Sequence, residues 1–200
     1  MKKLILIRHG QTRENTKGKL HGSEDSELLT EAGIEQMKKT AERLSEFSPG
    51  KIYASKKARA VQSGELIARE LGIPLETIEG MEERNWGEFS GKWWRDVEKL
   101  LNRMSLDARF DYVPPGGESW RQFEMRLIGA IRTLLQQNKK EIVVIIAHGG
   151  AIRALMPFLL NAPKEESFKY DPDNASLTIF DRDSNGTLRQ VAINDTSHLQ

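Results

Sequence analysis

The 200-residue sequence predicts an α/β fold, a three-layer helix–sheet–helix sandwich whose sheet is mostly parallel with an antiparallel edge. Apolar runs at residues 4–7 and 141–147 are typical of strands buried on both faces, as in a parallel sheet covered by helices. Segments with helical spacing of apolar residues alternate with the strands, which favours helices on both faces. Because the chain shows neither a linker nor an internal repeat, we expect a single domain over residues 1–200.

The first half of the chain is predicted to contain three strands and two helices. Strands are expected over residues 4–7, 52–54 and 75–78, where short apolar runs are bounded by turn residues. Residues 13–29 resemble a loop because they are rich in glycine and charge. Helices are expected from the N-cap Thr30 to Pro49-Gly50, and from Ser55 to Gly72-Ile73-Pro74.

The second half adds further helices and an antiparallel hairpin. Helices are expected over residues 93–104, from Glu118-Ser119 past the break at 114–117, and from the end of strand 141–147 to Leu160. Strands over 176–180 and 188–193 flank Asn185-Gly186, a dipeptide typical of hairpin turns. This hairpin supplies the predicted antiparallel edge of the sheet.

Composition limits the classes of function. The 30 Lys and Arg residues against 29 Asp and Glu give a net charge of +1, which argues against nucleic acid or an anionic membrane as partner. The absence of cysteine excludes disulfides, thiolate nucleophiles and zinc–thiolate sites. The apolar run at 4–7 is too short for a signal peptide, and no stretch reaches transmembrane length. We therefore expect a cytoplasmic protein, and the sequence leaves its oligomeric state open.

Charged and imidazole side chains follow both of the strongest strands. Arg8-His9-Gly10 ends the first strand, and His148 followed by glycines ends the strand over 141–147. Arg59 lies early in the helix after strand 52–54, and Glu83 follows strand 75–78. Because ligands in open α/β sheets bind at the carboxyl ends of the strands, we expect these side chains to meet in one crevice.

These residue types suit a phosphate ester. Arginine binds phosphate oxygens through bidentate, charge-assisted hydrogen bonds and keeps its charge at any relevant pH. A neutral imidazole is a competent nucleophile toward phosphorus, and a protonated carboxylic acid can donate a proton to the departing alkoxide. A dianionic phosphate beside a glutamate would raise the pKa of that glutamate toward the protonated form.

The chain resembles the histidine phosphatase superfamily, in its phosphoglycerate-mutase-like branch. The resemblance rests on ordered motifs that span nearly the whole sequence: Arg8-His9-Gly10-Gln11-Thr12 with Asn15, Leu29-Thr30-Glu31-x-Gly33, Ser55-x-x-x-Arg59-Ala60-x-Gln62, Glu83-x-x-x-Gly87, Pro115-Gly116-Gly117-Glu118-Ser119, Ala147-His148-Gly149-Gly150, Asp173-Asn174-Ala175-Ser176, and Asn194-Asp195 with His198-Leu199. Several ordered motifs are far more specific than the Arg-His-Gly triplet alone.

The resemblance implies a role for each matching residue. His9 would be the nucleophile that forms a phosphohistidine, and Glu83 the general acid and then the base that activates water. Arg8, Arg59 and His148 would hold the phosphoryl oxygens. Residues expected to contact the substrate also include Asn15, His21, Gly22 and Gly149. This mechanism needs no metal and no cofactor.

Two points of the match stay open. His21-Gly22 stands where the family usually has Gln-Gly, and the spacing from there to Leu29-Thr30 looks one residue off, so the substrate contacts of this loop are uncertain from sequence. Glu82 precedes Glu83, and the choice of Glu83 rests on its spacing to Gly87.

The resemblance implies a metal-independent phosphomonoesterase, a histidine acid-type phosphatase that acts on small phosphorylated metabolites. The alternative is a cofactor-dependent phosphoglycerate mutase, but the segment over 84–117, expected to cover the site and set specificity, lacks the longer, Arg-rich insertion associated with mutases. A non-catalytic phospholigand-binding module is disfavoured because His9, Glu83, Arg59 and His148 are all intact. The sequence leaves open which ester is hydrolysed, with α-ribazole phosphate, phosphoserine and sugar bisphosphates among the candidates. It also leaves open whether Trp86, Trp93 and Trp94 contact substrate or pack the short helix, the interpretation we prefer.

Overall fold

A six-stranded sheet in the order β3-β2-β4-β1-β5-β6 forms the centre of the computed structural model, which describes residues 2–21, 26–138 and 142–200. The strands are β1 (Lys3–Arg8), β2 (Lys51–Ser55), β3 (Leu75–Ile78), β4 (Ile142–Ala147), β5 (Leu177–Arg182) and β6 (Leu188–Asp195). β1, β2, β3 and β4 pair in parallel, whereas β5 pairs antiparallel with both β1 and β6. The predicted sheet with an antiparallel edge is confirmed. Glu141, where the expected strand begins, lies outside the described residues.

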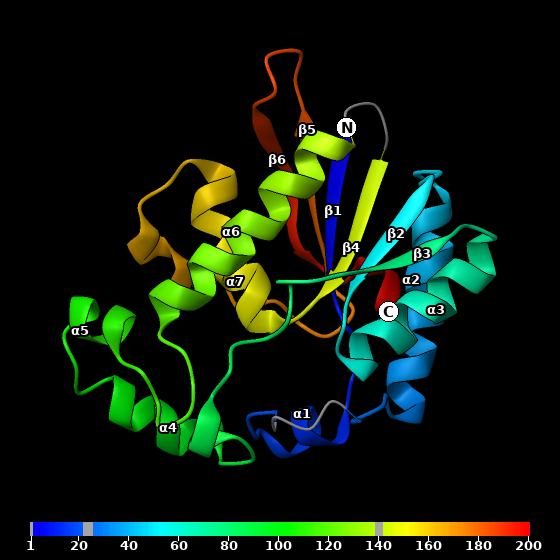
Figure 1. Ribbon diagram of the computed structural model, residues 1–200. Coiled ribbons are helices and arrows are strands. Elements are labelled where there is room, and N and C mark those ends of the chain that lie inside the picture. The colour runs from blue at the N-terminus through cyan, green and yellow to red at the C-terminus, as the bar shows by residue number, and fades with distance from the viewer. Residues whose placement is uncertain (1, 22–25, 139–141) are drawn as a thin grey trace.

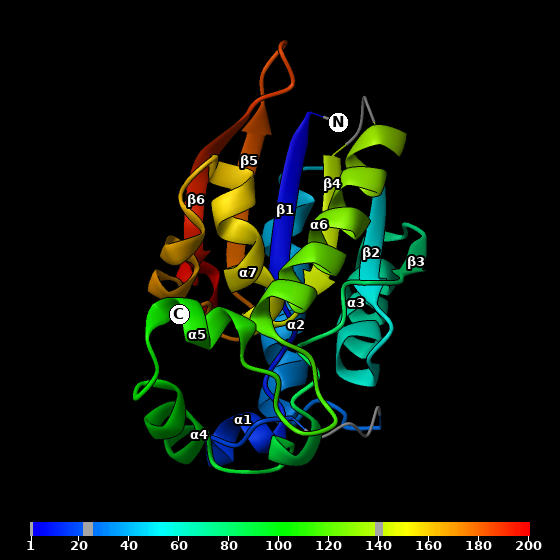
Figure 2. The ribbon, with the colours of Figure 1, turned by 60° about the vertical axis from the view of Figure 1, so that its left-hand side comes forward.

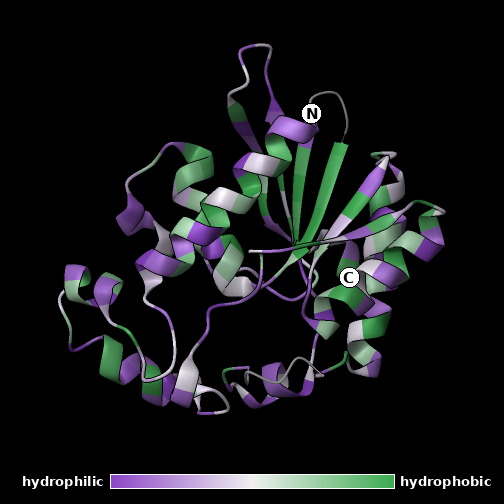
Figure 3. Cartoon of the chain, in the orientation of Figure 1, coloured by the Kyte–Doolittle hydropathy of each residue, from purple (hydrophilic) through white to green (hydrophobic). Residues whose placement is uncertain are grey.

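Helices cover both faces of the sheet (Figures 1 and 2). α2 (Glu31–Ser45) and α3 (Ala58–Leu71) pack on one face, and α6 (Trp120–Gln137) and α7 (Gly149–Leu160) pack on the other. β1 serves both layers because successive side chains of a strand point to opposite faces. Leu4 and Leu6 belong to the core beneath α6 and α7, while Ile5 and Ile7 belong to the core beneath α2 and α3. Figure 3 shows the central strands as the most apolar part of the chain.

Short helices lie below the carboxyl ends of the parallel strands (Figures 1 and 2). They are α1 (Arg13–Lys17), η1 (Gly87–Phe89), α4 (Trp94–Leu101) and α5 (Leu106–Asp111). Trp86, Val97 and Leu101 form a small core of their own in this region, separate from the two cores of the sheet. The segment that links β3 to α6 therefore lies over the sheet edge where the motif residues emerge.

Several predicted boundaries were wrong for identifiable reasons. Residues 13–17 are a helix rather than a loop, because Thr12 and Asn15 form a reciprocal capping box that begins α1. The single helix expected over 93–104 ends at Leu101, and a new helix begins after the N-cap Ser105. Ser55 does not begin a helix but ends β2, and α3 begins only at Ala58.

The chain after α7 adds structure that periodicity did not indicate. The short 3-10 helices η2 (Lys164–Lys169) and η3 (Ser197–Leu199) were not predicted, because runs this short carry no clear apolar repeat. The hairpin of β5 and β6 is confirmed, with Gly186 at φ +90° in its turn. Within the described ranges, the helices are too short or too polar to cross a lipid bilayer.

The start of α2 packs closely on the residues that follow β1. Thr30 caps the helix by accepting from Gly33 N at 3.0 Å, as predicted, and its own amide donates to Gln11 O at 2.9 Å. A Cβ placed on Gly33 would lie 2.2 Å from Gln11 O. Gly129, also within a helix, has open space at the same position.

We expect Gly33→Ala to lower the free energy of unfolding by about 1–3 kcal/mol, because backbone must move to admit the methyl group. Gly129→Ala is the matched control, and we expect it to raise the free energy of unfolding by about 0.5–1 kcal/mol, because alanine favours the helix. Urea denaturation of both variants measures the two effects. Equal changes in the two variants would contradict the close contact.

Candidate active site

His9 lies buried where the chain leaves β1, with 1% of its surface exposed. Its Nδ1 is 2.7 Å from Gly10 O, and because a carbonyl only accepts, Nδ1 carries the proton. Nε2 is therefore unprotonated, and its lone pair accepts from Arg59 Nε at 3.2 Å. Burial first, and then the positive charge of Arg59, hold the pKa of His9 well below its ordinary value. The imidazole is neutral at pH 7, in the state a nucleophile needs.

His148 emerges beside His9 because their strands are neighbours in register. Arg8 pairs with Ala147, so the next residue of each strand lies at the same level. The two ring centroids are 5.3 Å apart. His148 Nε2 lies 2.8 Å from Ser55 Oγ, and burial followed by the charge of Arg59 holds the His148 pKa well below its ordinary value.

Two arginines bring fixed positive charge to this edge. Arg59, the second residue of α3, is 1% exposed. Its carbonyl accepts from Ser63 Oγ, and Ser63 Oγ accepts from Gly10 N at 3.2 Å. Arg8 donates through Nη1 to Pro172 O at 2.6 Å. Burial lowers the pKa of Arg8, but an arginine keeps its charge at any relevant pH.

Glu83 is the carboxylate that reaches this group. Its oxygens accept from Arg84 N at 2.8 Å and from Gly150 N at 2.9 Å, and Gly150 lies in the first turn of α7. A Cβ on Gly150 would lie 2.2 Å from Glu83 Oε1, so only glycine allows this approach. Glu82 instead accepts from Gly80 N at 2.9 Å and lies 3.7 Å from Arg126 Nη1.

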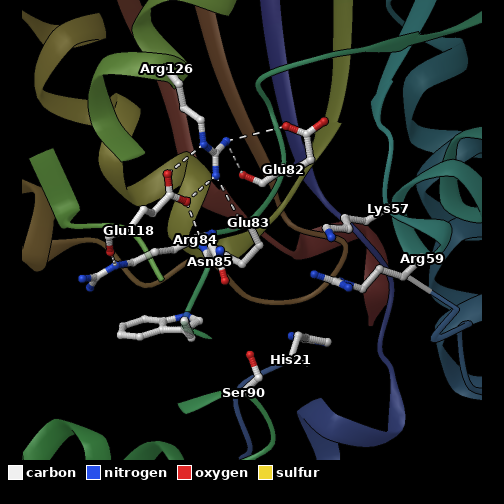
Figure 4. A pocket seen from close by; sticks show the side chains of 11 residues that line it. His21, Lys57, Arg59, Glu82, Glu83, Arg84, Asn85, Ser90, Glu118 and Arg126 are labelled. Carbon is white, nitrogen blue, oxygen red and sulfur yellow. Dashed lines mark hydrogen bonds and ion pairs between the residues drawn. The ribbon is translucent and has the colours of Figure 1, made fainter. Parts of the chain in front are cut away.

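Arg126 holds the main chain around Glu83 (Figure 4). Its five N–H groups find five acceptors: the carbonyls of Gly80, Glu82 and Glu83 at 2.9–3.1 Å and both carboxylate oxygens of Glu118 at 2.7 and 3.0 Å. Glu118 also accepts from Asn85 N at 2.8 Å. Sequence reasoning missed Arg126, because a polar residue on a helix face gives no signal of the loop it binds. Glu118 could have been predicted near the site, since it belongs to the Gly-Gly-Glu-Ser motif of the family.

Asn15 and Asn174 line the other side of His9. Asn174 Nδ2 lies 3.0 Å from both His9 O and Asn15 Oδ1, so it joins the loop after η2 to the start of α1. Asn174 belongs to the Asp-Asn-Ala-Ser motif, but the sequence did not predict it at the site. His21 lies 5.5 Å from His9 between ring centroids, and its Nε2 contacts Thr12 Oγ1 at 3.0 Å and Glu27 Oε2 at 3.2 Å. Burial, Arg59 and Arg8 together lower the pKa of His21 to about 3.

Two cavities open onto these residues. The first, of about 380 Å³, includes His21, Arg59, Glu83 and Arg126 in its lining (Figure 4). The second, of about 240 Å³, includes Arg8, His9, Asn15, Glu83 and Gly149. The structure thus brings together the expected residues Arg8, His9, Asn15, His21, Arg59, Glu83, His148 and Gly149, whereas Gly22 lies outside the described residues. Among the described residues, no three histidine or carboxylate side chains are grouped as a metal site requires.

The tryptophans of the covering segment divide between two roles. Trp86 and Trp94 pack edge to face, with ring centroids 5.9 Å apart, and both also line the second cavity. Trp93 is 43% exposed and lies beneath the cations of Lys19 and Arg95 instead. The preferred packing interpretation therefore holds for Trp86 and Trp94, which in addition face the site.

Comparison with known proteins identifies relatives along the whole chain. The family model described as histidine phosphatase superfamily (branch 1) matches residues 4–196. A metal-independent phosphoserine phosphatase of Arabidopsis thaliana is 34% identical over 76% of this chain and 66% of its own length, just short of two thirds. A 2,3-bisphosphoglycerate-dependent phosphoglycerate mutase of Thermoplasma acidophilum is 28% identical over 100% of this chain and 97% of its own. A crystal structure of a phosphoserine phosphatase mutant from Entamoeba histolytica with phosphoserine superposes with a TM-score of 0.87 at 27% identity, over 100% of both chains.

The buried imidazoles make stability depend on pH. Because the pKa values of His9, His21 and His148 are lowered in the folded protein, the unfolded chain binds more protons below about pH 6.5. The free energy of unfolding therefore falls as the pH drops below that value, by about 1.4 kcal/mol per pH unit for each imidazole.

We expect His21→Gln to reduce this slope by about 1.4 kcal/mol per pH unit between pH 5.5 and 4.5, since one titrating group is removed, as urea denaturation at several pH values would measure. Arg132→Gln, an exposed change on α6, serves as control and keeps the slope of the natural sequence. An unchanged slope in His21→Gln would mean that His21 titrates normally in the folded protein.

Proposed function

The chain belongs to the histidine phosphatase superfamily, and on that basis we propose that it is a metal-independent phosphomonoesterase that acts through a phosphohistidine on small phosphorylated metabolites. The observation that carries the proposal is the state of His9. Its Nδ1 donates to Gly10 O at 2.7 Å, so the ring is neutral and Nε2 carries its lone pair beside the Arg59 guanidinium. A nucleophile of this kind attacks phosphorus without prior loss of a proton.

In the first step, His9 Nε2 forms a bond to phosphorus while the bond from phosphorus to the ester oxygen breaks. Glu83, protonated, gives its proton to the departing oxygen, so that an alcohol leaves. In the second step, Glu83 takes a proton from water, and the oxygen of that water bonds to phosphorus. The phosphorus–Nε2 bond breaks, and inorganic phosphate and neutral His9 are restored.

Fixed charges and backbone donors would stabilise the transferred group. Arg8 and Arg59 supply two guanidinium groups, and His148 lies 5.3 Å from His9 between ring centroids. Asn15 offers a polar contact, and Gly149 begins α7, whose N-terminus favours an anion. His21 and Gly22 complete the expected substrate contacts. Because this charge comes from the protein, the proposed reaction has no step that requires a metal.

A cofactor-dependent phosphoglycerate mutase is the second candidate. Its support is the 28% identity with the Thermoplasma mutase over the full chain. A mutase would return the phosphoryl group from His9 to an organic acceptor rather than to water. The short segment over 84–117 favours hydrolysis, because it lacks the longer, Arg-rich insertion associated with mutases. 3-Phosphoglycerate with and without 2,3-bisphosphoglycerate separates the two, since only hydrolysis releases phosphate in step with substrate loss.

We expect the protein to release phosphate from at least one ester in a panel of p-nitrophenyl phosphate, phosphoserine, α-ribazole phosphate and 3-phosphoglycerate, in the presence of EDTA. His9→Ala should lower the rate by more than about 10³-fold, because the nucleophile is lost. Circular dichroism controls for folding of the variant. Full activity of His9→Ala would contradict the phosphohistidine, and loss of activity in EDTA with recovery on adding a divalent cation would contradict metal independence.

Glu83→Gln should slow alkyl phosphates by about 10²- to 10⁴-fold and aryl phosphates with good leaving groups much less, because only a poor leaving group needs its proton. Steady-state rates on ethyl phosphate and p-nitrophenyl phosphate give the comparison. Glu82→Gln is the matched control and should affect both esters equally and weakly. Equal losses on both esters in Glu83→Gln would assign the acid to another group.

A further inference from the structure

In the proposed reaction, the alcohol part of the phosphate ester would lie in the second cavity. Of the two cavities, it alone includes both His9 and Glu83 in its lining. In the proposed reaction, phosphorus lies near His9 Nε2 and the ester oxygen lies near Glu83. The remainder of the substrate therefore extends into this cavity, and its other walls select the alcohol.

Part of those other walls is apolar or aromatic. This part includes Leu20, Trp86, Trp94, Leu101, Trp120 and Phe168. Trp86 and Trp94 meet edge to face at 5.9 Å, while Trp120 and Phe168 have ring centroids 4.8 Å apart, so the rings are held by one another. Such a surface gains most from an apolar or aromatic body, since a small polar alcohol would leave it in contact with water.

Two arginines from different elements line the same cavity. Arg109 comes from α5 and Arg153 from α7. Arg109 lies over the Phe168 ring at 4.2 Å and donates to Asn102 Oδ1 at 3.2 Å, and it forms no ion pair with a carboxylate of the described residues. Arg153 pairs with Asp171, which is mostly exposed. Burial, and next the positive charge of Arg153, lower the pKa of Arg109, and both arginines line the same cavity.

An anion bound in this cavity would offset the positive charge of both arginines. The cations Arg8, Lys19, Arg84, Arg109 and Arg153 line the cavity, against the carboxylates of Glu83 and Asp171. The lining therefore carries three more positive charges than negative charges, and a phosphoryl dianion would neutralise only two of them. The planar fork of arginine matches a carboxylate through two parallel hydrogen bonds.

We propose that the second cavity selects phosphomonoesters whose alcohol joins an aromatic or similarly apolar body to a carboxylate, and that Arg109 and Arg153 bind this carboxylate. The inference rests on the proposed phosphatase function and adds the class of alcohol. Arg109 and Arg153 are thus specificity-determining residues that act on the alcohol rather than on the phosphoryl group.

The test compares two esters that differ only in charge far from phosphorus: 2-(4-carboxyphenyl)ethyl phosphate and its carboxamide analogue. The two methylene groups insulate the leaving oxygen from the substituent, so the chemical step is matched. At low ionic strength we expect kcat/KM to be about 10- to 100-fold higher for the carboxylate. Arg109→Gln and Arg153→Gln should each reduce this ratio toward one, whereas Arg132→Gln should preserve it. The ratio is measured on one preparation, so a partly misfolded variant does not affect it.

Three results would overturn the inference. The first is a ratio of kcat/KM between the carboxylate and carboxamide esters near one in the natural sequence, and the second is a high ratio that both arginine substitutions leave unchanged. The third is a kcat/KM for ethyl phosphate equal to that of the carboxamide ester, which would show that the aromatic residues of the cavity do not contribute. In each case, His9-dependent hydrolysis of p-nitrophenyl phosphate would show that the phosphatase function stands. Absence of His9-dependent hydrolysis of every ester would instead refute the proposed function, and the inference with it.

Discussion

The register between β1 and β4 is the constraint on which the candidate site depends. Because Arg8 pairs with Ala147, His9 and His148 leave the sheet at the same level, with ring centroids 5.3 Å apart. A slip of one residue would turn each apolar side chain of β1 to the opposite layer. The cores on both faces of the sheet, filled by Leu4 and Leu6 on one side and Ile5 and Ile7 on the other, therefore also fix the distance between the two imidazoles.

Around this pair, the protein holds its polar groups by contacts between distant segments. Arg126 on α6 binds three carbonyls of the loop that carries Glu83, and Asn174 binds His9 O and Asn15. The planar, five-donor geometry of arginine suits three carbonyls and a carboxylate at once, which lysine could not match. The end of the candidate site where the phosphoryl group is proposed to bind is thus built on the sheet and the helices packed on it. The second cavity beside it depends on the small helices of the segment over 84–117.

The sequence predicted what periodicity and ordered motifs encode. The layered α/β fold followed from the runs at β1 and β4, and the positions of His9, Arg59, Glu83 and His148 at one edge followed from strand polarity and the family motifs. Contacts such as that of Arg126 with the Gly80–Glu83 backbone could not be predicted, because they join residues more than 40 positions apart with no repeat to mark them. Ser55 was misplaced because a serine after a strand resembles an N-cap, whereas its hydroxyl here contacts His148.

Burial of the imidazoles links the stability of the fold to its proposed chemistry. Desolvation and Arg59 lower the pKa of His9, so the folded protein gains nothing from protonating it and loses stability in acid. The same two effects keep the Nε2 lone pair available at neutral pH, where an exposed histidine would be partly protonated. In the proposed reaction, the charge of a bound phosphoryl dianion would oppose the effect of Arg59 and raise the pKa values of the neighbouring imidazoles. The pKa of His148, which lies close to His9, is well below its ordinary value in the free protein. In the proposed reaction His148 would then take up a proton and donate to a phosphoryl oxygen. The burial that lowers the stability of the free protein in acid would therefore make the site electrostatically complementary to the proposed substrate.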